Sequence, residues 1–249
     1  MPEKKRLDIV MVDQGLAPSR QRAKALIMAG KVLMDTQRMD KPGALVPADI
    51  VLSVKDNDPP FVSRGGLKLQ AALASLNLSV AQLVCMDVGA STGGFTDCLL
   101  QRGAARVYAV DVGYGQLAWQ LRQDTRVVVM ERTNIRHMTE EQMPEQVDLV
   151  TIDTAFISLK IVVPAVLKFL KPQGRILALI KPQFEAGKGR VGKGGVVRDV
   201  QQQAQIIQTL VCFFEAMHLT CGPVVPSPIL GPKGNQEFII VLHPFDSFI

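Results

Sequence analysis

Short apolar runs alternate with longer amphipathic stretches along most of this chain, from Val62 onward. Apolar runs of this length are typical of strands buried on both faces, and the amphipathic stretches between them are typical of crossover helices. The alternation predicts an α/β domain with a doubly wound, mostly parallel, Rossmann-like sheet. The predicted strands cover residues 83–88, 106–110, 126–130, 147–153 and 175–181.

The pattern changes toward the C-terminal end of the chain. Residues 159–170 and 200–216 have the periodicity of amphipathic helices. Two further apolar runs, 219–225 and 237–242, then follow each other with no helical pattern between them. Consecutive strands without a crossover helix pair antiparallel, so we expect a hairpin at one edge of the sheet.

The first 58 residues have a different texture, with shorter elements. A short helix is predicted to end at Gly15, and a second one to begin after Ser19, a favourable N-cap residue, and to end at Gly30. Short strands are predicted at 31–34 and 49–54. We therefore expect a small α+β domain at residues 1–58, a linker at 59–62 and the larger domain at 63–249.

A glycine-rich turn lies between the predicted strand at 83–88 and a helical pattern at 95–102. It reads Asp-Val-Gly-Ala-Ser-Thr-Gly-Gly-Phe-Thr-Asp, from Asp87 to Asp97. Glycines let the backbone approach a ligand closely, and the helix N-terminus offers free N–H groups. Asp111 follows the next strand, 22 residues after Gly89, where an acidic side chain can bind the hydroxyls of a ribose. The unit predicts a nucleoside or nucleotide site.

Four interpretations of this turn compete. A dinucleotide site prefers G-x-G-x-x-G, and the turn lacks the second glycine. The spacing of Gly89, Ser91 and Gly93 matches a hydrolase nucleophile elbow, but only His218 and His243 come late enough to serve as its base. An ordinary glycine turn remains possible from the motif alone. S-adenosylmethionine fits best, because its sulfonium nucleoside needs no phosphate cradle.

Composition limits the other classes of protein. The 249 residues carry a formal net charge of +5 and are 47% hydrophobic, which suits a folded protein with an anionic partner. The four cysteines lack C-x-x-C spacing, so we expect reduced thiols and no metal site. No secretory signal or 18-residue apolar run is present. We therefore expect a cytoplasmic protein.

Basic residues gather in two places. Between Met1 and Lys31, seven basic residues face three acidic ones. Such a cluster suits phosphate contacts to structured RNA, although a solvated basic helix face would look the same. The segment 185–199 mixes glycines with Lys188, Arg190 and Lys193, and misses a P-loop because Gly194 stands where Ser or Thr is required. We expect a basic lid over an RNA site, with a plain surface loop as the alternative.

Several motifs together resemble a known family. Arg6-Leu7-Asp8, the run from Gly15 to Arg20 and the spacing from Ala23 to Val32 are similar to the RNA-binding domain of the ribosomal protein S-four type. A second group of motifs covers the rest of the chain: Ser63-Arg64-Gly65-Gly66-x-Lys68-Leu69, the turn at 87–97, the run from Ala109 to Leu117, and Lys181-Pro182-Gln183-Phe184-Glu185. These motifs resemble those of the TlyA family of FtsJ-like ribosomal RNA ribose methyltransferases, some of which are called haemolysins.

The resemblance implies a Lys-Asp-Lys-Glu catalytic set, which maps onto Lys68, Asp153, Lys181 and Glu237. Asp153 and Lys181 also end neighbouring predicted strands, where an open α/β sheet builds its site. One departure is that the family reads Asp-Val-Ser-Phe after the strand, whereas this chain reads Asp153-Thr154-Ala155-Phe156. Because the aspartate is retained, we expect the chemistry to survive this change, which leaves the packing after Asp153 open.

The sequence thus predicts an S-adenosylmethionine-dependent ribose 2′-O-methyltransferase, and the resemblance implies cytidine in ribosomal RNA as its target. A non-catalytic ribosome assembly factor and a membrane-active haemolysin are the alternatives. The expected cofactor site comprises Gly89, Ala90, Ser91, Thr92, Gly93, Gly94, Phe95, Asp111, Val112, Asn134 and Asp153. The expected RNA contacts are Arg6, Arg20, Arg22, Lys24, Lys31, Arg64, Lys188, Arg190 and Lys193.

Overall fold

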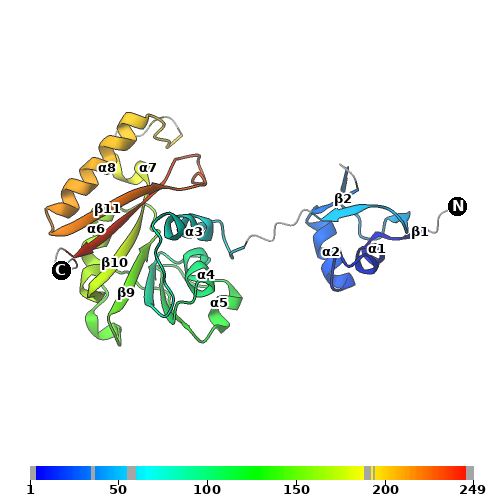
Figure 1. The fold of residues 1–249 in the computed structure, drawn as a ribbon, viewed down its shortest axis with the longest axis horizontal. Coiled ribbons are helices and arrows are strands. Elements are labelled where there is room, and N and C mark those ends of the chain that lie inside the picture. The colour runs from blue at the N-terminus through cyan, green and yellow to red at the C-terminus, as the bar shows by residue number, and fades with distance from the viewer. Residues whose placement is uncertain (1–3, 35–36, 55–59, 188–191, 193, 245–249) are drawn as a thin grey trace. The chain divides into compact units, whose positions relative to one another are not determined.

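The computed structural model describes residues 4–34, 37–54, 60–187, 192 and 194–244. The chain divides into two compact units, Met1–Asp58 and Pro59–Ile249 (Figure 1). Each unit has its own hydrophobic core, and the two are described separately below.

The N-terminal unit packs two short helices against small sheets. Helix α1 (Leu7–Asp13) contacts α2 (Arg20–Met28), and the apolar side chains of both helices form the core. Ser19 caps α2 as predicted, since its hydroxyl accepts a hydrogen bond from the backbone N–H of Arg22 at 3.2 Å. Strand β1 (Lys4–Arg6) pairs with β4 (Leu45–Pro47), while β2 (Val32–Met34) lies between β3 (Gln37–Met39) and β5 (Leu52–Val54).

The larger unit confirms the predicted mostly parallel sheet. Its strands lie in the order β11-β12-β10-β9-β6-β7-β8, and the last five of these run parallel to one another. The chain starts at β6 and then moves outward in both directions, so the order reverses between β6 and β9. Open α/β sheets bind ligands at the carboxyl ends of the strands beside this reversal. The strands are β6 (Val84–Val88), β7 (Arg106–Val110), β8 (Val127–Met130), β9 (Val147–Ile152), β10 (Leu170–Ile180), β11 (Leu219–Pro226) and β12 (Phe238–Pro244).

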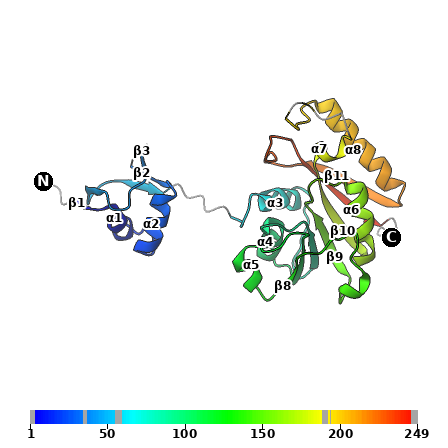
Figure 2. The ribbon, with the colours of Figure 1, turned by 180° about the vertical axis from the view of Figure 1, so that it is seen from behind.

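Helices cover both faces of this sheet (Figure 2). One face is covered by α3 (Gly65–Ser75), α4 (Gly94–Gln101) and α5 (Trp119–Gln123), and the other by α6 (Leu159–Val166) and α8 (Val200–Glu215). Neighbouring strand residues alternate between the two cores, as Cys85 and Met86 do on β6, because strand side chains point to opposite faces. The remaining short helices are η1 (Glu140–Gln142), η2 (Leu167–Phe169) and α7 (Pro182–Glu185).

The predicted C-terminal hairpin is confirmed. Strands β11 and β12 pair antiparallel, and β12 also pairs antiparallel with β10. In that register Ile180 lies opposite Phe238. The residue after β10, Lys181, and the residue before β12, Glu237, therefore meet at the edge where the parallel strands end.

One predicted helix is too long. The sequence predicts helix through residue 170, but α6 ends at Val166, a 3-10 turn follows, and β10 already begins at Leu170. Pro164 lies inside α6, and its ring removes one backbone donor from the helix. The predicted helix overlaps β10 only at Leu170, and the register of β10 against β9 shifts between Leu170 and Arg175.

Candidate functional site

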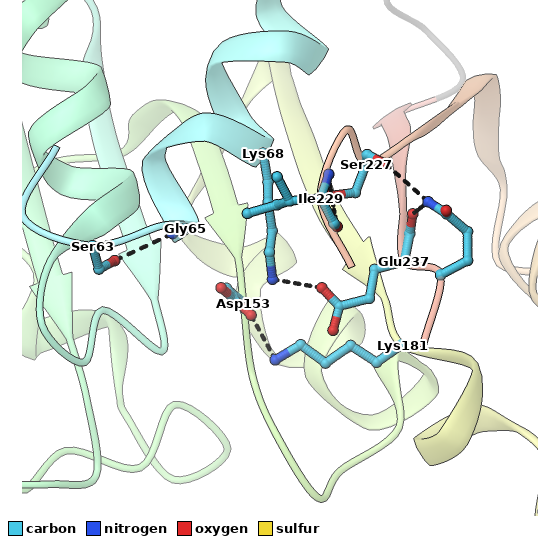
Figure 3. Close-up of polar contacts among 9 residues, drawn as sticks. Ser63, Gly65, Lys68, Asp153, Lys181, Ser227, Ile229 and Glu237 are labelled. Carbon is cyan, nitrogen blue, oxygen red and sulfur yellow. Dashed lines mark hydrogen bonds and ion pairs between the residues drawn. The ribbon is translucent and has the colours of Figure 1, made fainter. Parts of the chain in front are cut away.

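Four ionisable side chains predicted from the sequence converge at the carboxyl edge of the sheet. Asp153 follows β9, Lys181 follows β10, Glu237 precedes β12, and Lys68 lies in the first turn of α3. Figure 3 shows the four side chains pointing toward one another. The antiparallel insertion of β12 brings Glu237 to the same edge as the ends of the parallel strands.

The four groups form two ion pairs. Lys68 Nζ donates a hydrogen bond to Glu237 Oε2 at 2.5 Å, and the two side chains are 9% and 1% exposed. Lys181 Nζ lies 2.6 Å from Asp153 Oδ1, with side-chain exposures of 13% and 21%. The second contact is a charge pair without hydrogen-bond alignment, since Asp153 Oδ1 has no aligned donor. An ammonium group has three donors, so Lys181 retains donors for a substrate oxygen.

The glycine-rich turn passes directly beside this site. Gly89 has φ of +86°, and a Cβ there would lie 2.6 Å from the carbonyl oxygen of Asp153. Gly94, the first residue of α4, approaches α3 so closely that a Cβ would lie 2.9 Å from the backbone nitrogen of Gly66. Larger side chains are excluded at both positions, and this keeps the turn, Asp153 and the start of α3 together.

Asp111, the residue directly after β7, stabilises this turn. Its Oδ2 accepts a hydrogen bond from the Ser91 N–H at 2.8 Å, and its Oδ1 accepts one from the Gly113 N–H at 2.6 Å. A carboxylate has about four acceptor positions, so two remain for the hydroxyls of a ligand. Asp111 can therefore hold the turn and bind a ribose at the same time.

A second carboxyl group lies beneath the turn. Asp87 is fully buried and accepts hydrogen bonds from the Thr96 N–H and hydroxyl at 2.9 and 2.7 Å and from the Thr151 hydroxyl at 3.1 Å. Burial raises the pKa of Asp87 to about 7, with a smaller contribution from the charge of Asp153. Asp87 supports the turn, and its raised pKa lessens the negative charge beneath it near neutral pH.

Two cavities meet at Asp153 and Gly89. One of about 360 Å³ contains Lys68 and Lys181, and the other, of about 510 Å³, contains Asp111 and Asn134. All the predicted cofactor residues line one or both cavities except Gly93, whose φ of +99° shapes the turn. A further cavity of about 530 Å³ opens beside the start of β6 and contains none of the predicted residues. Three of the four predicted catalytic residues line the first cavity and Asp153 also lines the second, so these two cavities form the candidate site.

The predicted RNA-binding residues are divided between the two units. Arg20, Arg22 and Lys24 are exposed on α2, Arg6 and Lys31 are half-buried, and Arg64 lines the cavity with the two lysines. Arg6 and Arg20 share a carboxylate partner, Asp8, which sequence reasoning did not single out. Lys188, Arg190 and Lys193, the three basic residues expected in the lid at 185–199, lie outside the described residues.

Sequence reasoning missed several residues of the site. Glu185 caps α6, accepting hydrogen bonds from the Ser158 hydroxyl at 2.6 Å and the Leu159 N–H at 2.8 Å, and burial raises its pKa. Phe156, in the segment where the chain departs from the family pattern, has φ of +63°, is 89% exposed and contacts the ring of Phe184 at 5.0 Å. The sequence feature that could have pointed to Phe156 is its position three residues after Asp153. The cavity of about 360 Å³ is also lined by Ser63, Ile229, Leu230 and Pro232.

Two further findings concern metal binding and membrane spanning. Within the described ranges, no group of three or more His, Cys, Asp or Glu side chains is placed to hold a metal ion. None of the helices between residues 4 and 244 that the structure describes is long and apolar enough to cross a membrane.

Comparison with known proteins places the chain in a family. Residues 61–243 match the FtsJ-like methyltransferase family, and residues 5–49 match the S4 domain. The chain is 47% identical over 244 residues to the Mycobacterium tuberculosis 16S/23S rRNA (cytidine-2′-O)-methyltransferase TlyA, covering 98% of this chain and 91% of that one. It is 38% identical over 244 residues to Hemolysin A of Brachyspira hyodysenteriae, covering 94% and 98% respectively.

A solved structure from Streptococcus thermophilus, which carries a provisional haemolysin name, is also similar. It is 42% identical, with a TM-score of 0.75 and coverage of 99% of this chain and 90% of that chain. The match to the family model covers most of the chain, and the resemblance expected from the sequence is confirmed. The chain therefore belongs to the FtsJ-like methyltransferases, with the TlyA proteins among its relatives, and carries an S4 domain at its N-terminus.

Proposed function

We propose that this protein transfers a methyl group from S-adenosylmethionine to a ribose 2′-hydroxyl of ribosomal RNA, with cytidine as the target nucleoside. The observation that carries the proposal is the convergence of Lys68, Asp153, Lys181 and Glu237 beside the glycine-rich turn. The similarity to TlyA methyltransferases supports the choice of substrate. A cytoplasmic location is part of the proposal, because the proposed substrate belongs to the ribosome.

Of the two cavities that meet at Asp153, the larger one, which contains Asp111 and Asn134, fits the cofactor. Its volume of about 510 Å³ is in the usual range for small-molecule sites. Asp111 offers acceptor positions to the ribose, Asn134 is the candidate for the adenine, and the glycine turn gives room for the backbone to approach the ligand. When bound, the cofactor supplies an electrophilic methyl group on a sulfonium.

The smaller cavity would hold the target nucleotide. A 2′-hydroxyl is a weak acid, and its oxygen would develop alkoxide character as it bonds to the methyl group and its proton passes to solvent water. Lys181, which Asp153 holds within 2.6 Å, is placed to stabilise that charge. The buried ion pair with Glu237 holds Lys68 in the lining of the same cavity. Holding the reacting atoms in line would contribute much of the acceleration.

Replacing Asp111 with alanine should weaken binding of S-adenosylmethionine by about 1–3 kcal/mol, because hydrogen bonds to a charged acceptor disappear. Calorimetric titration of the full chain measures this change. Part of the weakening would come through the turn, since Asp111 also holds Ser91. Unchanged affinity in a folded variant would contradict the assignment of the ribose to Asp111.

Neutralising Arg20 and Arg22 together should weaken binding to ribosomal subunits and lower the log–log salt slope by roughly one unit for each phosphate that the variant no longer neutralises. Cofactor affinity and the methylated position should not change, because binding to phosphates carries no sequence information. Binding measured at several salt concentrations tests this. The same affinity and slope as the unaltered protein would show that α2 does not dock RNA.

Mass spectrometry of ribosomal RNA nucleosides tests the activity itself. Subunits lacking the modification should gain 2′-O-methylcytidine when incubated with the protein and S-adenosylmethionine. Binding of subunits without methylation would favour the alternative, a non-catalytic assembly factor. Leakage of liposomes without any methylation would favour the haemolysin.

A further inference from the structure

A buried carboxylate lies between two arginines of the S4 domain. Asp8, at the start of α1, is fully buried. Arg6 donates to it through Nε at 3.0 Å and Nη2 at 3.2 Å, so this contact is bidentate. Arg20, the first residue of α2, donates to the same carboxylate through Nη2 at 3.1 Å. One acidic side chain therefore fixes two guanidinium groups from different elements.

The backbone holds this arrangement in place. The Asp8 N–H donates to the carbonyl of Pro42 at 3.1 Å, and the neighbouring Leu7 N–H donates to Ala44 at 2.8 Å. The Arg6 guanidinium lies against Gly43, where a Cβ would lie only 3.3 Å from Nη1. The position of Asp8 thus depends on the fold of the unit and not on the two arginines alone.

The arginines keep outward-facing parts. The Arg6 and Arg20 side chains are 43% and 54% exposed. A guanidinium has five N–H donors, of which Arg6 uses two and Arg20 one on Asp8. The hydrogen bond from Arg6 lowers the pKa of Asp8, so the carboxylate stays charged at neutral pH. Counted by charge alone, Asp8 should hinder the approach of a polyanion.

We infer that Asp8 is a positioning residue that joins Arg6 and Arg20 into one preformed phosphate site, and that it strengthens RNA binding despite its negative charge. The inference rests on the proposed function, because it takes RNA as the ligand of the S4 domain. A free arginine loses side-chain entropy when it grips a phosphate, whereas these two arginines are already held. The side-chain entropy saved on binding exceeds the electrostatic cost of the Asp8 charge, because solvent and salt screen that charge near exposed groups.

Two substitutions that change the charge equally give opposite expectations. Asp8→Asn removes the shared anchor, and its amide would direct N–H groups at a guanidinium. Asp13→Asn removes the same charge at the end of α1, where Asp13 is 51% exposed and 3.4 Å from Lys5. Binding of the full chain to unmethylated ribosomal subunits is measured for both. Asp8→Asn should weaken binding about five- to twenty-fold, while Asp13→Asn should leave it equal or tighter. Equal or tighter binding by Asp8→Asn would overturn the inference.

A second variant decides the matter if Asp8→Asn disrupts the S4 domain, which circular dichroism and thermal melting would reveal. Arg6→Lys with Arg20→Lys keeps every charge and removes the fork that Asp8 holds. This variant should also bind several-fold more weakly, and unchanged affinity would overturn the inference. Failure of the unaltered protein to bind subunits in a salt-dependent way would instead contradict the proposed function, so the two failures are distinguishable.

Discussion

The Lys181→Ala variant is expected to lose methyl transfer, with the single-turnover rate falling by at least about 100- to 1000-fold. Cofactor affinity should be largely retained, because Lys181 lines the cavity assigned to the target nucleotide and not the one that contains Asp111. Its role lies in the transition state, so the loss belongs to the chemical step. Rapid-quench kinetics with saturating subunits, together with calorimetry of the cofactor, measure the two quantities separately.

The chain offers a matched control on the same strands. Lys171 pairs with Asp148 at 2.7 Å near the start of β10 and β9, as Lys181 pairs with Asp153 at their ends. Lys171→Ala removes a lysine of an aspartate pair far from the site and should leave the rate unchanged. A near-normal rate in Lys181→Ala would move the role to another group, of which Lys68 is the first candidate.

The Glu237→Ala variant is expected to be destabilised by about 3–5 kcal/mol, because the buried Lys68 ammonium loses its partner. Chemical denaturation should show the destabilisation as a lower midpoint. The double variant Lys68→Met with Glu237→Leu removes both charges and should recover most of the stability but no activity. Recovered stability without recovered activity would show that the pair of Lys68 and Glu237 serves the reaction and is not needed for stability.

An exposed ion pair provides the comparison. Lys5 and Asp13 lie 3.4 Å apart with both side chains in solvent, and breaking this pair should barely change stability. The expectation for the buried pair fails if Glu237→Ala unfolds at the same denaturant concentration as the unaltered protein. It also fails if the double variant keeps methylating RNA.

Half of the candidate catalytic set follows from strand pattern alone. Asp153 and Lys181 come directly after apolar runs that are recognisable as parallel strands, and such ends meet at one edge of the sheet. Lys68 and Glu237 are 169 residues apart, and no hydrophobic pattern in the sequence predicts that they contact each other. Only the family resemblance linked them to the site, and the antiparallel insertion of β12 is the physical reason that they meet.

Other structural features have no local sequence pattern from which they could be predicted. Strands β1 and β3 have three residues each and read Lys-Lys-Arg and Gln-Arg-Met, so no apolar run marks them. The burial of Asp8 depends on contacts with both flanking arginines and with the backbone of residues 42–44. The left-handed backbone of Phe156 has no signal in residue type, since bulky side chains rarely adopt it.

The position of β12 has a consequence for synthesis of the protein. This strand is the last one that the described residues contain, yet it lies inside the sheet between β11 and β10, and the residue before it is Glu237. Glu237 and its partner Lys68 are 169 residues apart, and contacts so distant in sequence form late, because a long loop must close first. A nascent chain that has not released β12 leaves Lys68 without its partner. A product truncated before Glu237 would lack one of the four candidate groups, and Lys68 would have no partner, even if the cofactor turn had formed.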